Sequence, residues 1–213
     1  MSRNRRRDRP LASFNSNLRW GDVPHSIAPF VPTPMKVVQN MLQLGEVGPD
    51  DTLYDLGCGD GRILFTAVEE FDVKQAVGYD LNASMCEATQ KKINDKGLKD
   101  RIKVVNGNFF HTDLSPATFV TLYLTTSGNS KLRPKMEKEL REGSRVVSHD
   151  FPIHDWTTVK ADTPVHYVIG SHKIFVYQVP EAFKKDMTLL KSLEGASRLG
   201  KIRDYFRREG EPD

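Results

Sequence analysis

The chain has 213 residues and a mass of 24.1 kDa, which fits one domain with short additions, given roughly 100–200 residues per domain. Apolar residues make up 38% and charged residues 28%, with 31 basic against 28 acidic side chains, and this mixture excludes a wholly disordered chain. Two cysteines, Cys58 and Cys86, are too few for a disulfide scaffold and fit a reducing compartment. No apolar run approaches the ~20 residues that span a bilayer, and the basic N-terminus lacks the apolar region of a secretory signal. We therefore expect a soluble, cytoplasmic protein.

The basic excess lies at the N-terminus. Residues 1–9 hold five arginines against Asp8, a net charge of +4, which leaves −1 for the rest of the chain. Such an arm contacts nucleic acid or an acidic partner, or it only keeps the chain in solution. We expect residues 1–27 to form a flexible basic arm and expect no membrane association.

Short apolar runs then alternate with helical patterns. A first helix is expected from Pro34, with Thr33 as its N-cap, and it ends at Gly45 or Gly48. Further helices are expected at 62–71, 83–96 and 131–140, with Asn82 capping the second of these. The predicted strands are 52–56, 75–80, 102–105, 118–124 and 144–148. This alternation is typical of βαβ units around a parallel sheet.

The pattern changes after residue 150. No good helix is expected between 151 and 163, and the runs 166–169 and 173–177 are split by a Gly-Ser pair, which predicts a hairpin. We therefore expect an α/β fold with a doubly wound, mostly parallel seven-stranded sheet and an antiparallel C-terminal hairpin. The folded domain would cover 28–180, and residues 181–213 would form a helical extension that packs on the domain or binds a partner.

A glycine-rich turn follows the first predicted strand. Residues 55–61 read Asp-Leu-Gly-Cys-Gly-Asp-Gly, and Asp80 ends the second strand 19 residues later. In a doubly wound sheet this acid faces the ribose of a bound nucleoside. The G-x-G-x-G spacing differs from the G-x-G-x-x-G dinucleotide fingerprint, and the carboxylate of Asp55 would repel a diphosphate while attracting an ammonium. These features favour S-adenosylmethionine over NAD.

This turn, with Gly78-Tyr79-Asp80, resembles motif I and the following acidic motif of class I S-adenosylmethionine-dependent methyltransferases. Three further stretches, 30–34, 107–110 and 144–151, resemble the small archaeal protein-lysine methyltransferases, which are relatives of the eukaryotic lysine methyltransferases of mitochondrial ATP synthase. The likeness covers about 28–180 and implies a Rossmann-like methyltransferase that uses S-adenosyl-L-methionine and releases S-adenosyl-L-homocysteine.

The resemblance implies roles for individual residues. Asp80 would hold the ribose, and Thr33 would lie over the methionine carboxylate, although it would otherwise be a simple cap. Asn108 and Phe109 would face the adenine, although Phe109 also suits an ordinary core. The residues expected to hold the methionine part are Asp55, Gly57, Gly59 and Gly61.

The acceptor is expected at the carboxyl end of the fourth strand. Tyr123 is our first candidate for an acceptor pocket, with Phe30 and Phe151 as its walls. A lysine amine must lose its proton before it attacks, at a cost of about 4.6 kcal/mol at pH 7, and an apolar aromatic pocket reduces that cost by lowering the amine's pKa. His149 and Asp150 end the fifth strand, where they would bind the acceptor or only close the sheet.

The leading hypothesis is therefore methyl transfer to lysine side chains of proteins. The alternatives are an RNA or other nucleic-acid methyltransferase that docks through the arginine arm, a small-molecule methyltransferase, and a cofactor-binding module without turnover. Cys58 and Cys86 are not placed for nucleophilic attack on a base. The six histidines lack the spacing of metal ligands, with His149 and His154 five residues apart, so no metal site is expected.

Overall fold

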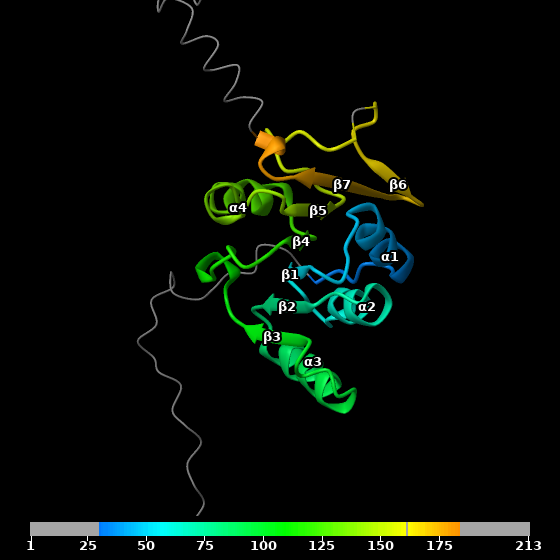
Figure 1. Cartoon of the computed structure of the whole chain (residues 1–213), viewed down its shortest axis with the longest axis vertical. Coiled ribbons are helices and arrows are strands. Elements are labelled where there is room, and N and C mark those ends of the chain that lie inside the picture. Colours follow the sequence, from blue (N-terminus) through cyan, green and yellow to red (C-terminus); the bar gives the residue numbers. More distant parts are fainter. Residues whose placement is uncertain (1–29, 161, 184–213) are drawn as a thin grey trace, which may run out of the picture.

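The computed structural model describes residues 30–160 and 162–183. Its centre is one seven-stranded sheet with the order β3-β2-β1-β4-β5-β7-β6. The first five strands in sequence run parallel, whereas β7 pairs antiparallel with both β5 and β6. The expected fold class, a doubly wound mostly parallel sheet with an antiparallel C-terminal hairpin, is confirmed (Figure 1).

The strands and helices alternate as the sequence predicts. The strands are β1 (Thr52–Leu56), β2 (Gln75–Asp80), β3 (Ile102–Asn106), β4 (Phe119–Leu122), β5 (Arg145–His149), β6 (Tyr167–Ile169) and β7 (His172–Gln178). The helices are α1 (Met35–Leu44), α2 (Arg62–Phe71), α3 (Ala83–Asp95) and α4 (Thr126–Glu139), with a 3-10 turn η1 (Phe109–His111).

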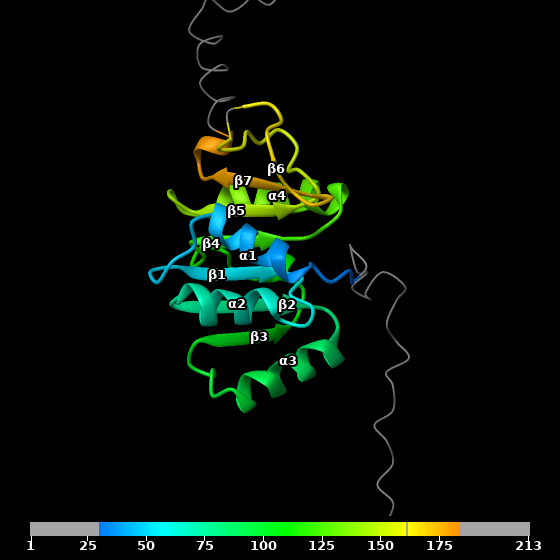
Figure 2. The same cartoon turned by 90° about the vertical axis from the view of Figure 1, so that its right-hand side faces the viewer.

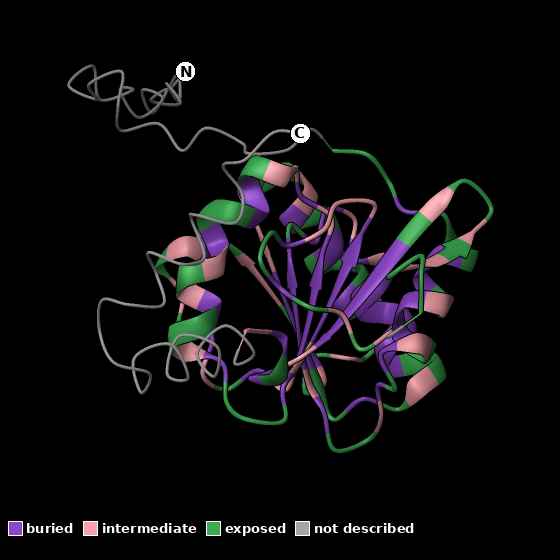
Figure 3. Ribbon diagram, turned by 90° about the horizontal axis from the view of Figure 1, so that it is seen from above, coloured by how far each residue is buried: buried purple, intermediate pink, exposed green. Residues whose placement is uncertain are grey.

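Two hydrophobic cores lie on the two faces of the sheet. Helices α1, α2 and α3 cover one face, in front of the strands in Figure 2, and α4 covers the other. Neighbouring strand residues alternate between the cores: Val147 packs with α1 and α2, while Val146 packs with α4. Figure 3 shows the buried strands enclosed by helices whose outer faces are exposed. The two cores explain why the central strands are apolar on both faces.

Several boundaries differ from the expectations, most of them by one residue. Thr33 is not the cap of α1, because Pro34 takes that position and its carbonyl accepts from the amides of Val37 and Val38. The fourth strand ends at Leu122, before Tyr123. Helix α4 begins five residues earlier than expected, at Thr126, so Pro134 lies inside the helix rather than in its first turn.

The expected boundaries of the basic arm and of the C-terminal extension lie almost wholly outside the described residues. Only residues 181–183 of the predicted extension are described, and they have helical geometry. Among the described residues, no helix is long and apolar enough to cross a membrane.

Candidate active site

The glycine-rich turn joins β1 to α2 at the carboxyl edge of the sheet. Gly57, Gly59 and Gly61 all have positive φ angles, of 100°, 51° and 77°, a region that other residues enter only with strain. The amides of Gly57 and Cys58 both donate to the carbonyl oxygen of Tyr79, at 2.9 and 3.0 Å. The turn is therefore fixed to the end of β2, and α2 begins directly behind it.

Asp55 lies inside the protein, directly before this turn. Its side chain is 3% exposed, and the hydroxyl of Thr121 on β4 donates to its Oδ1 at 2.7 Å. Burial raises the pKa of Asp55 to about 7, and the hydrogen bond from Thr121 opposes this rise. A cationic ligand group beside Asp55 would favour the charged carboxylate, because it would replace the lost hydration.

Asp80 stands at the end of β2, across the turn. Its Oδ2 accepts from the amide of Gly59 and its Oδ1 from the amide of Asn82, both at 2.8 Å. Two backbone amides thus orient the carboxylate, and each of its oxygens keeps a further lone pair for a ligand hydroxyl. The Asn82 side chain accepts from the amide of Met85 and caps α3, as expected.

A cavity of about 370 Å³ opens at this edge of the sheet, within the usual range of small-molecule sites. Seven of the predicted site residues line it: Phe30, Thr33, Asp55, Gly57, Asp80, Phe109 and Tyr123. The sequence reasoning missed Asp60, Arg62, Leu81 and Met85 among the other lining residues. Asp60 lies inside the glycine motif and Arg62 directly after it, and this proximity could have identified both as residues of the site.

Four predicted residues do not line the cavity. Gly61 packs the turn against α3, since a Cβ there would lie 2.6 Å from Cγ2 of Thr89. Asn108 caps η1 by accepting from the amide of Phe110 at 3.0 Å. Gly59 lies beneath the ring of Phe30, whose Cε2 would be 2.5 Å from an added Cβ. The fourth, Phe151, is described below with Tyr123.

The segment ahead of α1 covers the turn. Arg62 donates to the carbonyl oxygen of Thr33 at 2.7 Å and forms an ion pair with Asp60 at 2.6 Å. The Thr33 side chain is buried, and its Oγ1 lies 3.2 Å from Nδ1 of His149. Thr33 therefore connects the cavity with β5 instead of capping the helix.

Tyr123 follows β4 and lies between the cavity and the end of β5. Its ring is 3.9 Å from the His149 ring and 6.4 Å from the Phe151 ring, measured between centroids. Its hydroxyl donates to Oδ2 of Asp150 at 3.4 Å. Burial, followed by the neighbouring charge of Asp150, raises the pKa of Tyr123. The structure thus brings together Tyr123 and Phe151, while Phe30 stands at the cavity mouth with 54% of its surface exposed.

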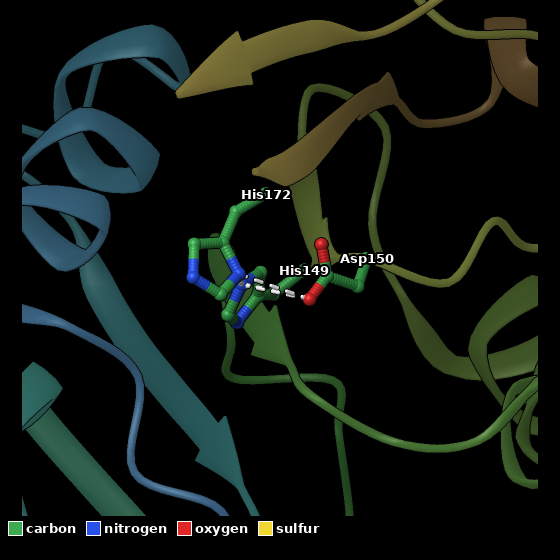
Figure 4. Close-up of side chains that lie close together, drawn as sticks. All are labelled: His149, Asp150 and His172. Carbon is green, nitrogen blue, oxygen red and sulfur yellow. Dashed lines mark hydrogen bonds and ion pairs between the residues drawn. The ribbon is translucent and has the colours of Figure 1, made fainter. Parts of the chain in front are cut away.

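His149 and Asp150 do not line the cavity but support residues that do. His149 is fully buried, and burial lowers its pKa to about 4, so its ring is neutral at pH 7. Asp150 has a φ of 58° and contacts His172, which comes from β7 (Figure 4). Sequence spacing gave no sign that His172 would join this group.

The charges around the cavity fit a cationic ligand. Among the described residues that line the cavity, three carry a carboxyl group, namely Asp55, Asp60 and Asp80, and Arg62 carries the only guanidinium. S-adenosylmethionine carries an ammonium and a sulfonium with ribose hydroxyls, and it has no phosphate. The donor set therefore fits this cofactor better than it fits a dinucleotide.

Comparisons with known proteins agree with this chemistry. Residues 55–160 match the ANTKMT methyltransferase domain family. The chain is 48% identical over 160 residues to a protein-lysine N-methyltransferase of Saccharolobus islandicus, covering 71% of this chain and 98% of that protein. It is 30% identical over 151 residues to the adenine nucleotide translocase lysine N-methyltransferase of Mus musculus, covering 71% of this chain and 63% of that protein. The chain thus spans less than two thirds of the mouse relative.

A solved structure is similar over most of its length. The crystal structure of an RNA methyltransferase from Salinibacter ruber, in complex with S-adenosyl-L-homocysteine, aligns with a TM-score of 0.66 and 36% identity. The alignment covers 71% of this chain and 95% of that chain. The acidic cavity beside the glycine turn agrees with membership of a methyltransferase family. The 48% identity to the archaeal protein, over 98% of its length, shows that the chain belongs to the protein-lysine N-methyltransferase family of class I S-adenosylmethionine-dependent methyltransferases.

Proposed function

We propose that this enzyme transfers methyl groups from S-adenosylmethionine to the ε-amines of lysine side chains in proteins. The main support for this proposal is the 48% identity to a protein-lysine N-methyltransferase over 98% of that protein's length. The acidic lining of the cavity supports it, because both the cofactor and a lysine are cationic. S-adenosylmethionine, when bound, supplies a methyl group on a sulfonium that needs no further activation.

The cofactor would be held by groups that the fold already orients. We propose that Asp55 binds the α-ammonium, with Gly57, Gly59 and Gly61 supplying the backbone turn around the methionine part. Asp80, fixed by two amides, would accept from the ribose hydroxyls.

Three further residues would complete the cofactor site. Phe109, buried beside the cavity, would present a flat face to the adenine, and Asn108 would shape the loop that carries it. Thr33 would cover the methionine carboxylate.

Tyr123 is the proposed centre of the acceptor pocket, with Phe30 and Phe151 as walls. A lysine needs about 4.6 kcal/mol to lose its proton at pH 7, and desolvation against aromatic rings lowers that cost. The rings would also face the methylated product, whose cationic head is attracted to an aromatic face. Positioning the amine in line with the methyl group is then the main task of the protein.

The rim of the cavity favours a protein acceptor. Phe30, Val31 and Met35 are each about half exposed, and the first two line the cavity mouth. Exposed apolar side chains beside a site are typical of protein-binding surfaces. A polyanion would instead meet three carboxyl groups.

RNA is the second candidate substrate. It is favoured by the similar structure from Salinibacter ruber, which is an RNA methyltransferase, and by the arginines of residues 1–9, which lie outside the described residues. The two unpaired, buried cysteines support a cytoplasmic location for either reaction.

The test is methyl transfer from tritiated S-adenosylmethionine to a native cell extract, divided before counting into protease-treated and nuclease-treated halves. We expect the label to be lost to protease and to map to lysines by mass spectrometry. Loss to nuclease would overturn the lysine proposal in favour of RNA. The Asp80→Ala variant serves as the cofactor-deficient control, and no label should appear with it.

A further inference from the structure

We propose that His149, Asp150 and His172 form a binding site for a divalent transition-metal ion such as Zn²⁺. Each offers one ligand atom, and the three atoms lie close together where β5 ends and β7 begins (Figure 4). Nε2 of His149 is 2.9 Å from Nδ1 of His172 and 3.3 Å from Oδ2 of Asp150. The third side of this triangle, from Nδ1 of His172 to Oδ2 of Asp150, is 3.1 Å.

Hydrogen bonds alone use only part of this triangle, because a single proton on one ring nitrogen bridges one side of it at a time. If both ring nitrogens carry a proton, two N–H groups face each other along the 2.9 Å side. If only one of them does, the lone pair of the other nitrogen faces the carboxylate oxygen. A cation at the centre would use the lone pairs of all three atoms at once.

The spacing matches a metal site. Ligand atoms that lie about 2.0–2.1 Å from a zinc ion and 2.9–3.3 Å from one another subtend angles of roughly 90–110° at the ion. Two imidazoles and one carboxylate are ligands that Zn²⁺ and its neighbours in the first transition row prefer, whereas Mg²⁺ and Ca²⁺ favour oxygen. The side chains of Asp150 and His172 are about one quarter exposed, which leaves a path for the ion and for bound water.

Outer contacts hold two of the ligands in place. Nδ1 of His149 lies 3.2 Å from the hydroxyl of Thr33, and Oδ1 of Asp150 accepts from the amide of Lys173 at 2.8 Å. Metal-binding imidazoles and carboxylates are usually supported in this way through their second atom. Asp150 also keeps a left-handed backbone, with a φ of 58°, which is strained for this residue. Asp150 adopts this conformation directly after β5, and its carboxylate then lies beside both imidazole rings.

The proposed ion would act through its neighbours. Thr33 and Tyr123 both line the cofactor cavity, and both contact the His149–Asp150 pair. An ion bound to the pair would fix the positions of these two side chains. It would therefore be a structural ion that shapes the cavity wall, and the methyl transfer itself does not require it to contact the substrate.

The test uses the full-length, untagged protein after treatment with a chelator. We expect calorimetric titration with ZnCl₂ to show one bound ion per chain, and His172→Ala to weaken this binding about 100-fold or more. Titration with CoCl₂ should give a visible absorption band that the same variant loses. His154→Ala, a histidine outside the cluster, is the matched control and should bind as the native chain does.

Asp150→Asn keeps the size of the side chain and provides a second variant in case His172→Ala fails to fold. It should also lose the ion, while Thr33→Val should weaken binding roughly 10–100-fold through the lost outer contact. Absence of zinc binding in the native chain, or equal binding by His172→Ala and the native chain, would overturn the proposal.

Discussion

The backbone amide of Gly59 donates a 2.8 Å hydrogen bond to Oδ2 of Asp80, joining the glycine turn to the end of the neighbouring strand. The carboxylate is thereby held in place before any ligand arrives. Preorganised groups of this kind bind a ligand without a further ordering cost.

Removing this carboxylate should abolish cofactor binding. In Asp80→Ala, two proposed hydrogen bonds from ribose hydroxyls are lost, each worth about 1.5–3 kcal/mol with a charged partner. We therefore expect affinity for S-adenosyl-L-homocysteine to fall at least about 100-fold by calorimetry. Asp95→Ala, an exposed acid on α3, is the control and should bind normally. Unchanged affinity in Asp80→Ala would refute the ribose assignment.

Asp55 should make the free protein less stable as the pH rises. Its folded pKa, raised by burial to about 7, exceeds the ordinary value of 3.8. The unfolded chain therefore releases its proton first, and the stability that is present below pH 4 is lost as the pH rises through 7. The loss is on the order of 4 kcal/mol.

Asp55→Asn, which cannot ionise, should lack this component of the pH profile. Free energies of unfolding for both proteins, measured with urea between pH 5 and pH 8, should diverge, with the native chain losing more. Parallel profiles would show that Asp55 does not titrate in this range.

The ring of Tyr123 should matter more than its hydroxyl. Tyr123→Phe keeps the ring against His149 and loses only the 3.4 Å hydrogen bond to Asp150, so methyl transfer should fall less than about 10-fold. Tyr123→Ala removes the proposed wall of the acceptor pocket, and we expect a fall of about 100-fold or more. Steady-state rates on a lysine substrate report on the acceptor pocket, and the affinity for S-adenosyl-L-homocysteine reports on the cofactor site. Measuring both in each variant separates a defect in acceptor binding from a defect in cofactor binding. Equal losses in both variants would contradict this assignment.

Gly78 should tolerate no side chain. A Cβ there would lie 2.6 Å from Cδ1 of Leu64 and 2.7 Å from Sγ of Cys58. Overpacking of this kind costs about 1–3 kcal/mol, so Gly78→Ala should lower the free energy of unfolding by that amount in urea. Gly48→Ala, where nothing lies within 4 Å of the added atom, is the matched control. A Gly78→Ala protein as stable as this control would show that β2 and α2 can move apart freely.

The sequence predicts the first half of the fold closely because local signals agree there. β1, α2 and β2 have the expected bounds, since an apolar strand precedes the glycine turn, and Asn82 caps the helix that follows β2. The same signals located Asp55 and Asp80 at the cavity. Each of these residues stands at or next to the carboxyl end of its strand, so its position follows from the parallel topology.

Helix α4 was predicted too short because its first turn is held by distant contacts. Residues 126–130 include threonine, serine, glycine and asparagine, which are weak helix formers. Thr125 caps this turn by accepting from the amide of Gly128 at 3.1 Å. Asn129 is buried and donates to the carbonyl oxygen of Phe151 at 2.9 Å. This contact spans 22 residues, and a local pattern does not contain it.

The cluster of two histidines and an aspartate depends on strand register. His149 and Asp150 are adjacent in sequence, but His172 reaches them only because β7 pairs antiparallel with β5, placing Ile174 opposite His149. A different register would move His172 along the strand and separate the ligand atoms. The spacing of histidines along the chain therefore did not predict the cluster.

β1 lies between β2 and β4 in the sheet, and this order separates the proposed cofactor contacts from the proposed acceptor contacts. The proposed cofactor contacts come mainly from the ends of β1 and β2 and from η1, whereas the proposed acceptor contacts come mainly from the chain after β4. The proposed donor and acceptor contacts therefore come largely from separate, consecutive stretches of the polypeptide, apart from Phe30, which precedes α1. On these assignments, exchanging the chain after β4 is expected to change the target, whereas β4 itself belongs with the methyl donor site, because Thr121 holds Asp55.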